Sequence, residues 1–225
     1  MPVPLITAIE KQPRRQRANI ALDGEYALSL RLDVIAMAGL APGLDLTPAR
    51  RIELEAEDQR LGAVEAALKL LAMGPRSEHD LRDRLKNRRQ FATEAVEHAV
   101  RRMRELGYLN DAAFARLYVE ARQASPRSKR ALTFELQRKG VDKRHVETAL
   151  EEHSDADAAY NAAQRRLRAL RETDRPTFER RLGNFLASRG FGYGVARSTI
   201  TRCWRELHDE DGGADEAAGF NPQYT

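Results

Sequence analysis

The sequence predicts a mainly α-helical protein: an elongated array of three tandem three-helix repeats, preceded by a small N-terminal antiparallel β-hairpin or sheet. Three observations support this fold class. The first residues alternate like strands, prolines recur at a nearly constant spacing, and a pair of leucines at helical spacing follows each of these prolines. We expect a β-rich segment with a short helix at 1–46, a linker helix and repeat 1 at 47–110, repeat 2 at 111–153, repeat 3 at 154–208, and a disordered acidic tail at 209–225.

The β-rich segment is predicted from alternating runs around a turn. Residues 17–22 and 25–30 alternate apolar and polar side chains, and Asp23-Gly24 lies between them. This dipeptide is a strong hairpin signal, because a type I′ turn needs positive φ at both central residues. Residues 5–9 are expected to add a third strand. Thr47-Pro48 then supplies an N-cap and a first-turn proline, which predicts the start of a long helix.

The repeats are predicted from Pro75, Pro126 and Pro176, which lie 51 and then 50 residues apart. Six residues after each proline begins a leucine pair at i and i+4, which marks one face of the middle helix of a unit. The pairs are Leu81 and Leu85, Leu132 and Leu136, and Leu182 and Leu186. Since one unit cannot bury its apolar face alone, neighbouring units are expected to stack. The alternative is that three similar helix triplets arose by chance within one bundle.

Flanking positions complete each unit. A basic residue lies three positions after each second leucine, and Gly140 and Gly190 follow as expected helix C-caps, since glycine adopts the left-handed conformation at little cost. The apolar positions of the third helices are Val96, Val100 and Met103, Val146 and Leu150, and Ile200 and Trp204. Those of the first helices are Leu68 and Leu71, Phe114 and Tyr118, and Tyr160 and Leu167.

Composition indicates a soluble globular protein of the cytoplasm. Of the 225 residues, 42% are hydrophobic and 32% are charged, which suits a core with a solvated surface. No apolar run approaches the roughly 20 residues that span a bilayer, and the N-terminus lacks the pattern of a secretory signal. The single cysteine, Cys203, excludes an intrachain disulfide, and its helical neighbours Ile200 and Trp204 favour a packing role over a reactive thiol.

Charge is distributed unevenly along the chain. The formal net charge is +4, yet five acidic residues and no Lys or Arg lie from Asp209 onward, so the preceding residues carry +9. Such a surplus attracts phosphate backbones or an acidic protein face through its summed field. A solvated surface of mixed sign is the other interpretation. The acidic tail either shields the basic body or keeps the chain soluble.

Basic positions outside the leucine stripe are the candidate binding residues. One helical face of repeat 1 carries Arg82, Lys86 and Arg89 at i, i+4 and i+7. Other candidates occupy equivalent places in the repeats, which would form rows on a stacked array. One row is Arg88, Lys139 and Arg189, and another is His79, Arg130 and Arg180. The full set is Arg82, Lys86, Arg88, Arg89, Arg127, Lys129, Arg130, Lys139, Arg180 and Arg189.

No enzyme signature is found, so we expect no catalytic residue, cofactor or metal. The stretch 190–194, Gly-Phe-Gly-Tyr-Gly, looks like a phosphate-cradling loop, but it links two predicted helices rather than a strand and a helix. His145 and His153 flank several glutamates, yet their eight-residue spacing is a poor arrangement for zinc and no H-E-x-x-H pair is present. The pattern favours a binding protein.

The junction before repeat 2 resembles a known family. The stretch 107–111, Gly-Tyr-Leu-Asn-Asp, followed by Phe114, Tyr118 and Arg122, closely resembles the most recognisable segment of the RecX family of bacterial recombination regulators. Weaker matches extend the resemblance over 61–208. They are residues 77–81 with Leu85 for the family's first-repeat helix, 132–136 with 139–141 for its second, and Leu182, 185–186, 189–191 and Ile200 for its third.

The resemblance implies a protein that binds the RecA recombinase, lodges in the groove of its filament on DNA, and restrains ATP hydrolysis, strand exchange and the SOS response. It also implies a monomer that binds single- and double-stranded DNA weakly. The chain departs from the family pattern in two places. Residues 125–128, Ser-Pro-Arg-Ser, stand where many relatives have a glycine-rich turn, and a strand-forming N-terminus belongs only to some branches.

Within the resembling segment we expect architecture rather than contact with a partner. Asp111 begins a helix, where an acid caps free N–H groups and meets the positive end of the helix dipole. Tyr108 and Leu109 are expected to staple adjacent repeats. The structural set is Gly107, Tyr108, Leu109, Asp111, Phe114, Tyr118 and Arg122. Two other functions stay open: a helix-turn-helix DNA binder that acts without RecA, because each unit can present a recognition helix, and a pure scaffold.

Overall fold

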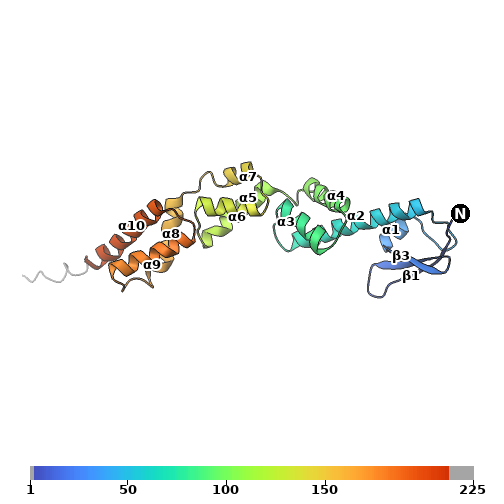
Figure 1. Ribbon diagram of the computed structural model, residues 1–225, viewed down its shortest axis with the longest axis horizontal. Helices are drawn as coiled ribbons and strands as arrows, with labels where there is room; N and C mark the ends of the chain where they lie inside the picture. The colour runs from blue at the N-terminus through green and yellow to red at the C-terminus, as the bar shows by residue number, and fades with distance from the viewer. Residues whose placement is uncertain (1–2, 213–225) are drawn as a thin grey trace, which may run out of the picture. The chain divides into compact units, whose positions relative to one another are not determined.

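The structure of the chain, a computed structural model, describes residues 3–212 (Figure 1). It divides into two compact units, Met1–Asn110 and Asp111–Thr225. Helices make up most of both units, and the strands lie in the first. The predicted fold class, three three-helix repeats with a small antiparallel sheet, is confirmed. The residue boundaries assigned to the repeats stay predictions.

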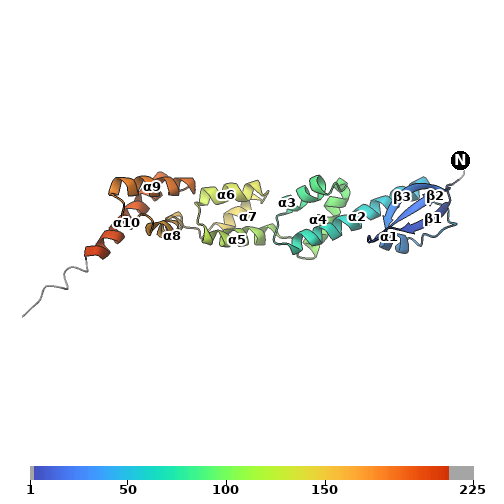
Figure 2. The same ribbon diagram turned by 90° about the horizontal axis from the view of Figure 1, so that it is seen from below.

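The sheet is a three-stranded meander of β1 (Ile6–Lys11), β2 (Arg17–Leu22) and β3 (Glu25–Arg31) in the order β1-β2-β3. The predicted hairpin turn is present, with φ of 50° at Asp23 and 90° at Gly24. One face of the sheet is buried through Ile6, Ile20 and Leu30. It packs with α1 (Leu32–Met37) on the N-terminal half of α2 (Pro48–Ala72), as Figures 1 and 2 show.

Asp58 of α2 connects this helix to the sheet. Its carboxylate accepts a hydrogen bond from the backbone N–H of Arg31 at 2.7 Å and another from the Arg17 guanidinium at 3.0 Å. Asp58 is only 7% exposed, so both bonds form largely away from water and fix the sheet against the helix. Thr47 is the predicted N-cap of α2, since its hydroxyl accepts a hydrogen bond from the N–H of Arg50.

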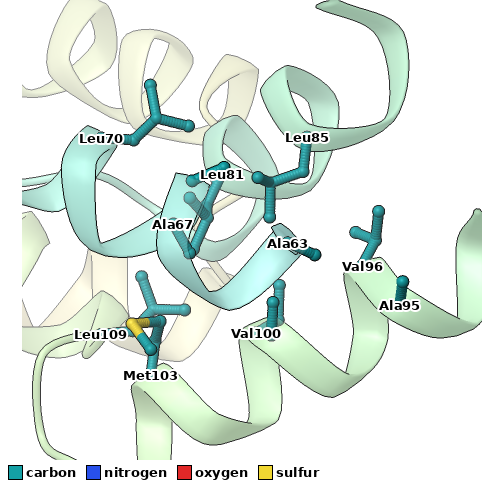
Figure 3. Packing of buried hydrophobic residues seen from close by; sticks show 12 residues of the cluster. Ala63, Ala67, Leu70, Leu81, Leu85, Ala95, Val96, Val100, Met103 and Leu109 are labelled. Carbon is teal, nitrogen blue, oxygen red and sulfur yellow. The ribbon is translucent and has the colours of Figure 1, made fainter. Parts of the chain in front are cut away.

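Repeat 1 consists of the C-terminal half of α2, α3 (Glu78–Asp83), a π-helical turn (Arg84–Arg88) and α4 (Thr93–Glu105). Figure 3 shows its core, in which the predicted Leu81 and Leu85 are fully buried between α2 and α4. The expectation that Leu68 would face this core is wrong, because its side chain is 40% exposed. The helix instead packs Ala63, Ala67 and Leu70, at i, i+4 and i+7, into the core of repeat 1.

Repeats 2 and 3 follow the same plan in the second unit. Repeat 2 contains α5 (Asp111–Ala121), a 3₁₀ turn (Arg122–Ala124), α6 (Lys129–Arg138) and α7 (Lys143–Ala149). Repeat 3 contains α8 (Asp155–Leu167), α9 (Arg175–Ser188) and α10 (Tyr193–Gly212). The predicted leucine pairs of α6 and α9 are at most 1% exposed, and each repeat has its own apolar cluster.

The starts of the middle helices differ between repeats. Buried Ser77 and Ser128 cap α3 and α6, two residues after the marker proline in each repeat. In repeat 3 the cap is Asp174, which accepts from the N–H of Thr177. The spacing predicts Pro176 in the connection before α9, but the residue lies in the first turn of that helix. A proline is tolerated there because the backbone N–H that it lacks would have no partner within the helix.

The C-terminal helix is longer than predicted. α10 extends to Gly212, so residues 209–212, assigned from the sequence to a disordered tail, are helical. The rest of the predicted tail, residues 213–225, lies outside the described residues.

Candidate nucleic-acid and protein-binding surface

A one-residue insertion separates repeat 1 from the other two repeats. The N–H of Phe91 bonds to the carbonyl of Leu85, six residues back, whereas Val141 and Phe191 make the same bond to a leucine five residues back, each at 3.2 Å. The extra residue is absorbed by the π-helical turn Arg84–Arg88.

This insertion corrects the predicted row of equivalent basic positions. The left-handed residue that follows the middle helix is Gln90 in repeat 1, with φ of 58°, and Gly140 and Gly190 in the other repeats. The residue before it, which caps the helix, is therefore Arg89, and not Arg88, in repeat 1. The structurally equivalent set is Arg89, Lys139 and Arg189.

The cations of repeat 1 divide into paired and unpaired groups. Arg82 is held by Glu78 at 3.1 Å and by Glu97 at 3.0 Å, so it is part of an internal network. Lys86 and Arg88 are exposed on the π-helical turn, as is the capping Arg89. Within residues 3–212, no acidic partner lies in ion-pair range of these three.

In repeat 2, Lys139 contacts two aromatic rings of α5. Its ammonium nitrogen lies 6.0 Å from the ring centroid of Phe114 and 5.3 Å from that of Tyr118. The side chain is half-buried over these rings, a typical cation–π arrangement. Lys139 thus helps to pack α6 against α5.

Glu135 is the centre of a polar network that joins α5 to α6. Its carboxylate accepts from the Tyr118 hydroxyl at 2.7 Å and from Arg122 at 3.0 Å, and its second oxygen lies 3.1 Å from Nε of Arg127. The pKa of Tyr118 is raised, first by burial and then by this carboxylate. Arg127 is a partner-binding candidate by its sequence position, but its guanidinium is engaged here.

Arg189 is also engaged within the unit. It donates to the Ser125 hydroxyl at 2.7 Å and to the carbonyl of Pro126 at 3.2 Å, and its guanidinium lies 4.6 Å from the ring centroid of Phe185. These contacts tie the end of α9 to the segment before α6. Arg189 therefore differs from the exposed cation that the predicted row implied.

The remaining predicted cations are exposed. Lys129 and Arg130 begin α6, and Arg180 lies on α9. The face of α6 that carries Arg130 also carries Phe134, which is not among the sequence candidates. Phe134 is 61% exposed, and the guanidinium carbon of Arg138 lies 5.9 Å from its ring centroid. The signal that could have found it is its spacing, because a residue two positions from both buried leucines lies on the opposite face of the helix.

The segment that carries the family resemblance contains both packed and exposed residues. Gly107 ends α4 with φ of 73°, and Leu109 is 2% exposed in the core of repeat 1. Tyr108 is 61% exposed, contrary to the expectation that it would pack. The ring centroids of Phe114 and Tyr118 lie 6.0 Å apart inside repeat 2. Asp111 is the first residue of α5.

Other sequence candidates have structural positions. The stretch 190–194 lies between two helices, as expected: residues 190–192 connect α9 to α10, and Tyr193 and Gly194 begin α10. Burial raises the pKa of the Cys203 thiol to about 11, which agrees with a packing role. Within residues 3–212, no cluster of three or more His, Cys, Asp or Glu side chains has the geometry to hold a metal ion. None of the helices described there is long and apolar enough to cross a membrane.

Comparison with known proteins gives consistent matches. Residues 110–150 match the family model of the second three-helix domain of RecX, and residues 154–200 match that of the third. The chain is 31% identical over 217 residues to the regulatory protein RecX of Lactobacillus delbrueckii, covering 92% of this chain and 77% of that one. It is 26% identical over 211 residues to the protein of the same name from Clostridium botulinum, covering 91% and 99%.

Solved structures agree with these matches. A crystal structure of regulatory protein RecX superimposes with a TM-score of 0.61 at 26% identity and covers 87% of this chain and 98% of that one. The crystal structure of RecX from Lactobacillus salivarius, at 18% identity, supports the fold with a TM-score of 0.56 over 65% of this chain and 97% of that one.

Proposed function

Since the chain belongs to the RecX family of regulatory proteins, we propose that it is an inhibitory modulator of the RecA recombinase. It binds in the groove of the RecA filament on DNA and restrains ATP hydrolysis, strand exchange and induction of the SOS response. It acts in the cytoplasm as a monomer, and its direct binding to single- and double-stranded DNA is weak.

The observation that supports this proposal is the set of exposed cations on the middle helices. Each repeat has cations without an ion-paired acid among the described residues: Lys86, Arg88 and Arg89; Lys129, Arg130 and Arg138; and Arg180. Cations without internal partners contribute little to folding, whereas their summed field attracts phosphates and acidic protein surfaces. A filament of recombinase on DNA offers both.

The proposal is tested by the ATPase rate of RecA on single-stranded DNA. We expect the purified chain to lower this rate at amounts well below one per recombinase. Replacing Lys129 and Arg130 together by glutamine should weaken the inhibition several-fold. The matched control is Arg50→Gln with Arg60→Gln, which removes the same charge from residues paired on α2. Unchanged ATP turnover and strand exchange with the wild-type chain would contradict the proposal.

A helix-turn-helix DNA reader is the second candidate, and one observation favours it. α6 and α7 are joined by a short turn, and α7 begins with the exposed cations Lys143 and Arg144. In such a reader these residues would contact base edges in the major groove. The two functions differ in a duplex-binding assay without RecA: a reader prefers one sequence, whereas the proposed modulator binds all duplexes with similar, weak affinity.

A further inference from the structure

Three arginines lie at the junction of repeats 2 and 3 without acidic partners. Arg165 and Arg166 are exposed on the last turn of α8, and Arg189 ends α9. Arg166 and Arg189 share one ring, with guanidinium carbons 4.9 Å and 4.6 Å from the centroid of Phe185. In the part of the chain that the structure describes, no carboxylate forms an ion pair with any of the three.

Backbone and hydroxyl oxygens hold two of the three arginines in place. Arg165 donates to the carbonyl of Ala124 and, at 3.3 Å, to that of Gln123. Arg189 is fixed by Ser125 and Pro126, and its Nε is buried without a hydrogen-bond partner. The guanidinium groups of Arg165 and Arg189 are therefore positioned before any ligand arrives, which lowers the entropy lost on binding, and that of Arg166 lies on the ring of Phe185.

The junction is electrostatically uncompensated. Burial lowers the pKa of Arg189, and the positive charges of Arg127, Arg166 and Arg165 lower it further. Arg127 has Glu135 as its partner, but that carboxylate is shared with Arg122. An anion at the junction would relieve the repulsion between these charges.

The surrounding surface fits a polyanion better than a single carboxylate. Residues 165–171 contain four arginines and no acid, and they lie at the C-terminal end of α8, where the helix dipole favours cations. A pocket of about 940 Å³ opens beside the group, and Arg127 and Arg165 are among the residues that line it. The acids on its lining, Glu152 and Asp157, are exposed.

We propose that Arg165 and Arg166, supported by the fixed charge of Arg189, bind one phosphate group of a nucleic-acid backbone. The planar guanidinium matches phosphate with two parallel hydrogen bonds, which an ammonium group cannot offer. The site deepens the proposed function and rests on it, since it assigns the contact with the DNA of the filament to the junction of repeats 2 and 3. Neither Arg165 nor Arg166 is among the binding candidates that the sequence pattern indicates.

The test is the affinity of the full chain for a labelled single-stranded oligonucleotide, measured by fluorescence anisotropy from about 50 to about 200 mM salt. Arg166→Gln should weaken binding about three- to tenfold and reduce the slope of log affinity against log salt by about one. Arg166→Lys keeps the charge but not the paired donors, so its affinity should lie between those of the wild type and Arg166→Gln. The control is Arg175→Gln. Arg175 lies at the start of α9, roughly 20 Å along that helix from Arg189 at its end.

Three outcomes decide the proposal. If Arg166→Gln binds the oligonucleotide like the wild type and like Arg175→Gln at every salt concentration, the phosphate site does not exist. If it lowers capture of RecA without DNA but leaves oligonucleotide binding unchanged, the arginines contact an acidic protein surface and the phosphate assignment is wrong. If millimolar inorganic phosphate displaces the labelled oligonucleotide as well as unlabelled oligonucleotide does at the same phosphate concentration, the site binds an adventitious ion only.

The same measurements separate this site from the proposed function. If the wild-type chain leaves the ATPase of RecA unchanged while Arg166→Gln still weakens oligonucleotide binding, the phosphate site stands and the modulator proposal fails. If the wild type inhibits the ATPase and Arg166→Gln changes neither salt slope nor affinity, the reverse holds.

Discussion

Replacing Gly190 by alanine tests the contact between repeats 2 and 3. Gly190 has φ of 86°, and a Cβ at this position would lie 2.7 Å from Oγ of Ser128 and 2.9 Å from Cβ of Ala131. A side chain in the left-handed region costs about 1–2 kcal/mol, and overpacking of a filled contact costs about 1–3 kcal/mol. We therefore expect Gly190→Ala to lower the free energy of unfolding of the second unit by about 2–5 kcal/mol.

The assay is urea unfolding followed by the fluorescence of Trp204, the single tryptophan, which packs edge-on against Phe178 in repeat 3. With a slope of about 2 kcal/mol per molar urea, the midpoint should fall by about 1–2.5 M. The control is Gly194→Ala in α10, which has open space at the Cβ position and should be neutral or slightly stabilising.

A double-mutant cycle with Ser128→Ala separates the clash from the backbone strain. Removing the Ser128 hydroxyl takes away the nearer of the two clashing atoms, so Gly190→Ala should cost less in the Ser128→Ala background than in the wild type. Equal costs in both backgrounds would refute the packing of α9 against the start of α6 that this structure shows.

Three further predictions concern single side chains. Glu135→Gln should lower the unfolding free energy of the second unit by about 2–3 kcal/mol, because it leaves two arginines without their carboxylate, whereas Glu120→Gln on the exposed face of α5 should have little effect. Cys203 should resist alkylation at pH 8 in the native chain and react at the rate of a free thiol in urea; rapid native labelling would contradict its burial. A hydrogen bond from Arg104 lowers the pKa of Glu78, so its stabilisation is present above the unfolded value of about 4.3 and is lost as pH falls through the lower folded value. Unfolding followed by circular dichroism should therefore show Glu78→Gln less stable than the wild type at pH 7, by a difference that narrows as the pH falls below about 4.3. A difference that stays constant as the pH falls would count against this assignment.

The parts of the fold that the sequence predicts depend on local rules. Asp23-Gly24 fixes a hairpin because both residues tolerate positive φ, and Thr47-Pro48 starts α2 because capping is decided within one turn. The leucine pair of each middle helix is buried because its i, i+4 spacing gives the repeat one apolar face. Each of these signals lies within a few residues of the structure that it determines.

The roles of the cations depend instead on residues distant in the chain. Arg189 contacts Ser125 and Pro126, more than sixty residues before it, and no pattern around Arg189 indicates that contact. Replacing Arg189 by alanine removes these contacts, so the structure predicts that this substitution destabilises the second unit. Arg165 and Arg166 lie outside the equivalent positions of the repeats, so the repeat pattern does not indicate them, although two arginines at a helix end are themselves a signal.

The insertion in repeat 1 gives the sharpest test of how the repeats correspond. Five residues separate Leu85 from Phe91, but four separate Leu136 from Val141. Deleting Asn87 should turn the π-helical segment into a regular α-helical end like those of repeats 2 and 3. The unfolding free energy of the first unit should then stay within about 1 kcal/mol of the wild type, because the strained turn is lost and the core side chains keep their positions.

The matched control is deletion of Gln137, which leaves only three residues before Val141. Because Val141 is 4% exposed in the core of repeat 2, pulling it out of register should cost about 2 kcal/mol or more. Equal destabilisation by both deletions would refute the register that assigns Arg89, rather than Arg88, to the position of Lys139 and Arg189. Deleting Asn87 also removes no charge, so any change in RecA inhibition would come from the direction in which the cations of repeat 1 point, and not from their number.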